Sequence, residues 1–202
     1  MGMVLSCKLA TALAKRLIDH LTDGCEQIST MGELRRKSGR LLLGRLGSDP
    51  DYLAECEEDT IGKFELLLLP KSDGGERASD HLADLDRYLH EMVARPKLAE
   101  FVRSDTSRAH DQRQLLISLP KRTPIRCDLF TVAAPDEWPT ALVYRTGSKR
   151  FVEWLEQQAA GQRLDLQDNG LWRGTRQIAL ADEQDLFSKL GIPFVPPSER
   201  GS

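Results

Sequence analysis

The chain has 202 residues, which fits one domain with an appendage or two small lobes, and this size can bury a sizeable core without disulfides or metal ions. Its formal net charge of −3 excludes a surface that attracts nucleic acid everywhere, so a polyanion site requires local clustering. No apolar run approaches the ~20 residues of a membrane span, and Lys8, Lys15 and Arg16 interrupt any signal-peptide pattern. The cysteines lack metal-type spacing, which indicates reduced structural thiols in a cytoplasmic protein.

The first part of the chain is expected to mix helices with short strands. Apolar residues at helical spacing predict a helix over residues 8–21, with Ser6 as its cap. A second helix is expected over residues 80–94, before Pro96. Short apolar runs predict strands over residues 28–31, 64–69, 98–102, 114–119 and 126–132.

The pattern changes at Trp138-Pro139, so a boundary between two lobes is placed near Pro135. Beyond it, residues 141–144 are expected to form a strand or an extended stretch, and Ser148 is expected to cap the next helix. A hairpin around Asn169-Gly170 and a short helix over residues 182–190 complete the prediction. This uneven alternation of helices and strands indicates an α+β (mixed α/β) fold.

Three segments carry the residue types of a metal-and-phosphate site. They are Gly32-Glu33-Leu34-Arg35-Arg36, Gly62-Lys63-Phe64-Glu65 followed by four leucines, and Cys127-Asp128-Leu129-Phe130. Nucleotide transfer uses divalent cations held by carboxylates, and magnesium prefers hard oxygen ligands. Phosphates are bound by backbone N–H groups at a glycine turn together with a nearby Arg or Lys. The residues by themselves therefore predict a site for metal and polyphosphate.

In this order, the segments resemble the motifs of family X DNA polymerases, the polymerase-beta-like nucleotidyltransferases, and most closely the small viral or phage-type members with only a palm and a thumb. The resemblance continues through Tyr144-Arg145-Thr146-Gly147-Ser148, Gly170-Leu171-Trp172 and Pro197-Ser198-Glu199-Arg200, and so covers nearly the whole chain. It implies a nucleotidyltransferase palm over residues 1–134 and a C-terminal thumb-like lobe over residues 135–202.

The resemblance also implies a function: a monomeric enzyme, not associated with a membrane, that adds nucleotides from a dNTP to a DNA 3′-hydroxyl in gap filling or repair. The mechanism would use Mg²⁺ or Mn²⁺, and the partners would be DNA and a nucleoside triphosphate. The implied catalytic residues and metal ligands are Asp128 and Glu65. The implied nucleotide-binding residues are Gly32, Arg36, Tyr144, Thr146, Gly147 and Ser148. The implied DNA-binding residues are Arg35, Lys37 and Arg40.

Two residues depart from the family pattern. Glu33 stands where the family has a phosphate-binding Ser, and Lys63 stands where the first metal-binding Asp belongs. At an effective dielectric of about 20 and a separation of about 4 Å, each of the two charge units changed at Lys63 is worth roughly 4 kcal/mol. A carboxylate from the acidic insertion at residues 49–59 would restore the site. Otherwise, a bridge from Lys63 to Asp128 or Glu65 would replace the metal.

These departures leave two alternatives to a DNA polymerase. One is a catalytically inactive relative that binds DNA, nucleotide or a protein partner. The other is a nucleotidyltransferase that acts on RNA or a small molecule.

Overall fold

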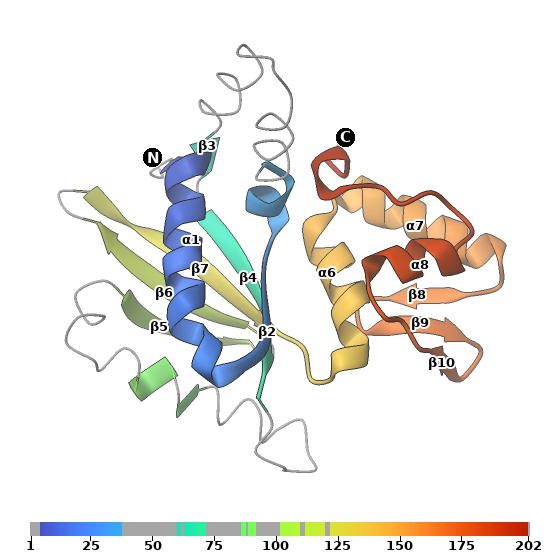
Figure 1. The fold of residues 1–202 in the computed structure, drawn as a ribbon, viewed down its shortest axis with the longest axis horizontal. Coiled ribbons are helices and arrows are strands. Elements are labelled where there is room, and N and C mark those ends of the chain that lie inside the picture. Colours follow the sequence, from blue (N-terminus) through green and yellow to red (C-terminus); the bar gives the residue numbers. More distant parts are fainter. Residues whose placement is uncertain are drawn as a thin grey trace.

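The structure, a computed structural model, describes residues 5–37, 60–61, 63–71, 86–87, 89–91, 102–109, 112–119 and 122–201. Within these ranges, no helix combines the length and the apolar character needed to cross a membrane. The described chain forms two lobes, a sheet covered by a helix and a smaller helical lobe that contains a three-stranded sheet (Figure 1). The predicted mixture of helix and sheet is confirmed.

The first lobe consists of one long helix on a five-stranded sheet. Helix α1 (Cys7–Leu21) begins at Ser6, whose side chain accepts a hydrogen bond from the Leu9 N–H, as predicted. The sheet has the strand order β2-β4-β7-β6-β5, and β4 and β7 are its parallel pair. Its strands are β2 (Cys25–Met31), β4 (Lys63–Pro70), β5 (Val102–Ala109), β6 (Gln112–Leu119) and β7 (Arg122–Thr131). A two-residue pair, β1 (Leu5–Ser6) with β3 (Thr60–Ile61), lies beside it.

Strand β4 is apolar on both faces because both faces are covered. Phe64, Leu66 and Leu68 pack in the cluster under α1, whereas Leu67 and Leu69 belong to a second cluster that includes residues of the other lobe. Since side chains alternate along a strand, Lys63 and Glu65 point to the same face as Leu67, away from α1. The fold therefore turns these two charged residues toward the other lobe.

The second lobe begins after β7. It contains the 3-10 turn η2 (Pro135–Glu137), helices α6 (Trp138–Thr146), α7 (Lys149–Gly161) and α8 (Glu183–Lys189), and the final turn η3 (Pro197–Glu199). Its small sheet has strands β8 (Asp165–Gln167), β9 (Gly170–Arg173) and β10 (Arg176–Ile178). The predicted caps Ser148 and Asp182 both accept hydrogen bonds from the first turns of their helices, and the predicted hairpin is β8–β9.

The prediction of an extended stretch at residues 141–144 is wrong, because this segment is the centre of helix α6. Ala141 and Leu142 pack against the first lobe, and Val143 and Tyr144 pack within the second. A helix buried on all sides shows no 3.6-residue alternation of apolar and polar residues, so its sequence resembles a buried strand. Pro139, in the first turn of the helix, was the available signal.

Several predicted features lie wholly or partly outside the described residues. They are Arg40, Gly62, the acidic insertion at residues 49–59, most of the strand expected at residues 98–102 and most of the helix expected at residues 80–94. The described positions of that helix, residues 86–87 and 89–91, are helical. Strand β5 continues past the end of the strand predicted at residues 98–102, and β10 was not predicted.

Candidate functional site

The register of β4 and β7 brings four charged side chains together. In this parallel pair, Lys63 lies opposite Arg126, and Glu65 lies opposite Asp128. All four are at alternate positions, so they share one face of the sheet. The predicted catalytic pair, Glu65 and Asp128, is thus adjacent, and each carboxylate has a basic residue two positions before it.

Lys63 occupies the space between the two carboxylates. Its Nζ lies 2.6 Å from Glu65 Oε1 and 3.1 Å from Asp128 Oδ2. The other oxygen of Asp128 accepts hydrogen bonds from Arg126 Nε at 2.6 Å and from Gln114 Nε2 at 3.1 Å. Asp128 is fully buried, and these three donors satisfy both of its carboxylate oxygens. We call Lys63, Glu65, Arg126 and Asp128 the charge cluster; its formal charges cancel.

The charge cluster favours the ionised forms of Asp128 and Lys63. Burial disfavours the charged carboxylate of Asp128, but the donors Arg126, Gln114 and Lys63 outweigh burial and lower the pKa of Asp128. Burial likewise disfavours the ammonium, but bonds to Glu65 and Asp128 outweigh it and raise the pKa of Lys63. Lys63 therefore carries a full positive charge at neutral pH at the place where the family pattern has a carboxylate.

The glycine turn predicted to bind phosphate lies directly against the charge cluster. Gly32 has φ +60, a conformation that favours glycine, and a Cβ there would lie 2.2 Å from Glu65 Oε2. It begins a helical segment over residues 32–37. On this segment Glu33 is exposed and pairs with Lys37 at 2.9 Å, so the charge of the predicted DNA contact Lys37 is balanced locally.

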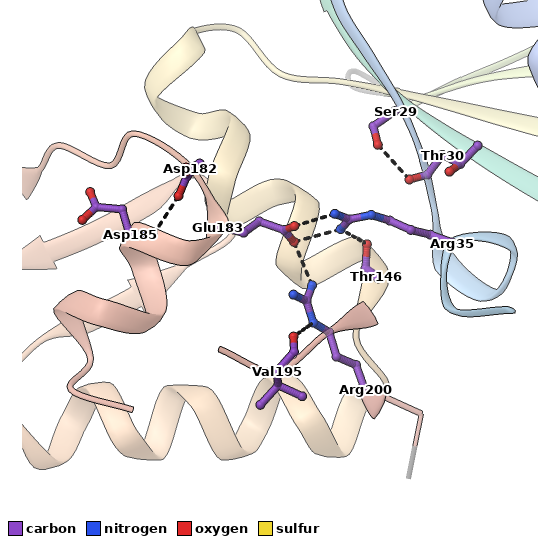
Figure 2. Close-up of polar contacts among 9 residues, drawn as sticks. All are labelled: Ser29, Thr30, Arg35, Thr146, Asp182, Glu183, Asp185, Val195 and Arg200. Atoms are coloured by element: carbon purple, nitrogen blue, oxygen red, sulfur yellow. Dashed lines mark hydrogen bonds and ion pairs between the residues drawn. The ribbon is translucent and has the colours of Figure 1, made fainter. Parts of the chain in front are cut away.

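The two neighbouring arginines of this segment connect the lobes. Arg35 forms a two-pronged ion pair with Glu183 of α8, at 2.8 and 2.5 Å, and also donates to Thr146 Oγ1 (Figure 2). Arg36 donates to the Thr146 carbonyl at 2.5 Å. The predicted nucleotide-binding Thr146 is thus held on its side chain and on its backbone by the first lobe.

A buried arginine completes this connection. Arg200 is fully buried and donates to Glu183 Oε1 at 2.7 Å and to the Val195 carbonyl at 2.9 Å (Figure 2). Its guanidinium also lies over aromatic rings, including those of Phe151 and Phe187. Burial disfavours the Glu183 carboxylate, but the two arginines outweigh it and lower the pKa of Glu183. We call Arg35, Glu183 and Arg200 the interlobe triad.

The remaining residues predicted to bind nucleotide form contacts within the second lobe. The Tyr144 hydroxyl lies 2.7 Å from the Leu166 carbonyl and 2.8 Å from Glu156 Oε1. Gly147 ends α6, and a Cβ there would lie 2.7 Å from the Phe151 ring. Ser148 caps α7, and its N–H donates to the Arg200 carbonyl.

Sequence reasoning missed Glu183, Arg126 and Gln114. For Arg126 a local signal existed, because a residue two positions before Asp128 on a strand shares its face. Glu183 and Gln114 are brought to the site by tertiary contacts, and the sequence around them carries no sign of these partners.

The described residues do not fit the pair of divalent cations that the family pattern implies. Two carboxylates are available, and each already bonds the ammonium of Lys63. Across the described part of the chain, no group of three or more His, Cys, Asp or Glu side chains is arranged to hold a metal ion. Divalent cations would have to displace Lys63 and would meet a cluster without net negative charge.

Comparisons with known proteins extend the likeness to the whole chain. The DNA polymerase beta thumb family matches residues 141–201. DNA nucleotidylexotransferase of Eulemur macaco is 38% identical over 65 residues, which cover 31% of this chain and 13% of that protein. Human DNA-directed DNA/RNA polymerase mu is 30% identical over 92 residues, covering 41% of this chain and 17% of that protein. The matched segments thus span less than a fifth of either relative.

Among solved structures, the Leishmania infantum polymerase beta ternary gap complex covers 98% of this chain and 71% of its own, with a TM-score of 0.71 and 16% identity. The ternary P/T complex of the same protein has a TM-score of 0.67 and 17% identity, and covers 98% of this chain and 77% of its own. At this level of identity, the likeness shows the fold.

Proposed function

We propose that this chain, whose fold is like that of polymerase beta and whose residues 141–201 match the polymerase beta thumb family, binds DNA on its palm–thumb fold without catalysing two-metal nucleotide addition. The observation that carries the proposal is the position of Lys63, within 3.1 Å of both remaining carboxylates. In this proposal Asp128 and Glu65 serve to hold the neighbouring strands β4 and β7 together. The binding surface would include the basic segment beside the charge cluster, where Arg36 and Lys37 are half-buried and would turn their remaining N–H groups toward phosphate.

The electrostatics of the charge cluster support this proposal. Replacing a carboxylate with an ammonium changes the local charge by two units. At an effective dielectric of about 20 and a separation of about 4 Å, each unit costs a cation of charge +1 roughly 4 kcal/mol, and a divalent ion about twice that. Conversely, a neutral cluster repels a polyphosphate backbone less than three uncompensated carboxylates would. Loss of the metal ligand and retention of DNA binding are therefore compatible.

The second candidate function is the DNA polymerase reaction itself, in which dNTP and Mg²⁺ or Mn²⁺ are used to extend a DNA 3′-hydroxyl in gap filling or repair. One observation favours it: Glu65 and Asp128 lie side by side, next to the glycine turn at Gly32. In that function they would be the metal ligands, and Arg36 with residues 144–148 would bind the nucleotide. It requires Lys63 to release both carboxylates.

One paired experiment separates the two functions. Binding of fluorescently labelled gapped DNA is measured by anisotropy with Mg²⁺ and with EDTA, and primer extension is measured in parallel with DNA and RNA acceptors. We expect DNA binding that survives EDTA and weakens with salt, and no extension. Asp128→Asn serves as the matched variant, because it keeps the shape of the side chain while removing its charge.

Two results would contradict the proposal in different ways. Metal-dependent extension that disappears in Asp128→Asn would establish a polymerase in which Lys63 moves aside, and extension of RNA alone would redirect the function to an RNA substrate. Absence of DNA binding by a folded wild-type protein would remove both the binding function and the polymerase function.

A further inference from the structure

The hairpin formed by β9 and β10 places two arginines directly opposite each other. Arg173 ends β9, Arg176 begins β10, and the two residues are partners in the antiparallel register. The two-residue turn between them contains Gly174 with φ +62, the conformation expected in a tight hairpin. Both arginines are exposed, and neither guanidinium group forms a hydrogen bond or ion pair with another described residue.

This arrangement disfavours the isolated hairpin. Directly opposite side chains on antiparallel strands have their Cβ atoms only about 5 Å apart, and like charges at that separation are destabilising. The same strands could carry any polar pair at this turn without that cost. An anion placed between the two guanidinium groups would convert the repulsion into attraction, since each guanidinium can bind a phosphate with two parallel hydrogen bonds.

A third cation lines the same hollow. A cavity of about 550 Å³ lies elsewhere in the chain beside acidic Glu26 and Asp182, whereas the one at this hairpin, about 510 Å³, is lined by Arg173, Arg176 and Lys189 with no carboxylate residue. Lys189, in the last turn of α8, is exposed and lies 3.8 Å from the half-buried Asp185, at a distance that makes the pair weak enough for an incoming anion to replace. The remaining lining residues are neutral, so the hollow has a net positive charge in a chain of net charge −3.

We propose that this hollow, the hairpin pocket, binds the phosphate backbone of DNA as a contact separate from the charge cluster. The proposal rests on the DNA binding proposed above and assigns part of it to the second lobe. Helix α6 contacts both β2 and β9, and in Figure 1 it lies between the five-stranded sheet and the hairpin. A duplex held by the basic segment beside the charge cluster would therefore need to extend past α6 to reach the pocket, so the contact lengthens the bound DNA segment.

The test is a salt titration of DNA binding. Wild-type protein and the Arg173→Ala/Arg176→Ala double variant are titrated with a labelled gapped duplex at a series of KCl concentrations. Loss of two phosphate contacts should weaken binding and reduce the slope of log K against log salt by about 1.8, at ~0.9 per phosphate. Arg173→Lys/Arg176→Lys should retain most of the slope, because the charges remain.

Two comparisons make the result specific. Lys8→Ala/Lys15→Ala removes the same charge from α1, on the opposite face of the sheet from the charge cluster, and should leave the slope close to wild type. The melting temperature of Arg173→Ala/Arg176→Ala should equal or exceed that of wild type, because the variant relieves a repulsion. Such a result would show that any loss of binding is not a loss of fold.

The possible failures are distinguishable. Unchanged affinity and slope in the arginine double variant, with wild-type DNA binding intact, would overturn the hairpin pocket and leave the proposed function standing. Binding to polyglutamate is measured alongside. If the arginine double variant binds DNA like wild type but no longer binds polyglutamate, the DNA contact is also overturned, in favour of an acidic protein partner. No DNA binding by any form would overturn both proposals.

Discussion

Removing the charge of Glu183 should loosen the connection between the lobes. In Glu183→Gln, the side chain keeps its shape but no longer pairs with Arg35 and Arg200, which approach it at 2.5–2.8 Å (Figure 2). Two guanidinium groups, one of them fully buried, would then face each other without a carboxylate between them. Because the glutamate is only 9% exposed, solvent cannot replace the lost partner.

The expected cost is large. Breaking a buried ion pair by removing one partner costs about 3–5 kcal/mol, and we take the lower end of this range because Arg35 remains partly exposed. For a chain of this size, about 3 kcal/mol corresponds to a fall in melting temperature of about 6–12 °C. Glu199→Gln is the matched control, an exposed acid in the same lobe that should cost less than about 0.5 kcal/mol.

The pH dependence gives a second readout with a defined sign. Because the folded-state pKa of Glu183 is lowered, the stability it contributes is present above its ordinary value of 4.5 and is lost as pH falls through the folded value. The difference between wild type and Glu183→Gln, measured by chemical denaturation, should therefore be largest at neutral pH and shrink below about pH 4.5. A difference under about 0.5 kcal/mol at pH 7, or one that stays constant into acid, would refute the role assigned to the interlobe triad.

Three further predictions concern the charge cluster and the buried thiols. Lys63→Asp should create a three-carboxylate site that binds Mn²⁺ in an EPR titration, whereas wild type and Lys63→Met should not; tight Mn²⁺ binding by wild type would contradict the conclusion that Lys63 excludes divalent cations from Glu65 and Asp128. Gly32→Ala should destabilise more than Gly174→Ala, since both glycines have positive φ but only the Cβ at Gly32 meets a carboxylate oxygen; equal melting temperatures would show that Glu65 moves away freely. Burial raises the pKa of the Cys25 thiol to about 11 despite Lys71, so at pH 8 the Cys25 thiol should react with Ellman's reagent only after unfolding, a result checked by mapping the labelled peptide.

The sequence was sufficient to predict helices that bury one face and expose the other. Helix α1 buries Ala10, Leu13 and Leu17 at helical spacing and leaves its other face in solvent, so its pattern was readable. The short capped helices α7 and α8 were predictable from Ser148 and Asp182 for a similar local reason. Helix α6 could not be recognised in this way, because it packs against both lobes and presents no polar stripe.

For the candidate site, the possibility of a bridge from Lys63 to Asp128 or Glu65 followed from the residue types alone, and the structure contains both bridges. The sequence did not reveal which residue pairs with Arg35. A basic residue next to a glycine turn predicts a phosphate or DNA contact from local chemistry. Its carboxylate partner, Glu183, lies 148 positions away and is brought into reach by the packing of α8 beside α6.

The segment over residues 32–37 couples the two charged networks to each other. At its start, Gly32 lies so close to Glu65 of the charge cluster that a methyl group there would displace the Glu65 carboxylate. One turn later, Arg35 and Arg36 bind Glu183 and Thr146 of the second lobe. A shift of the second lobe on DNA must therefore either break charge-assisted hydrogen bonds at the interlobe triad or move the glycine turn against Glu65. Since Glu65 and Asp128 share Lys63, a movement of that turn that displaces the Glu65 carboxylate would change the contacts of both carboxylates with Lys63.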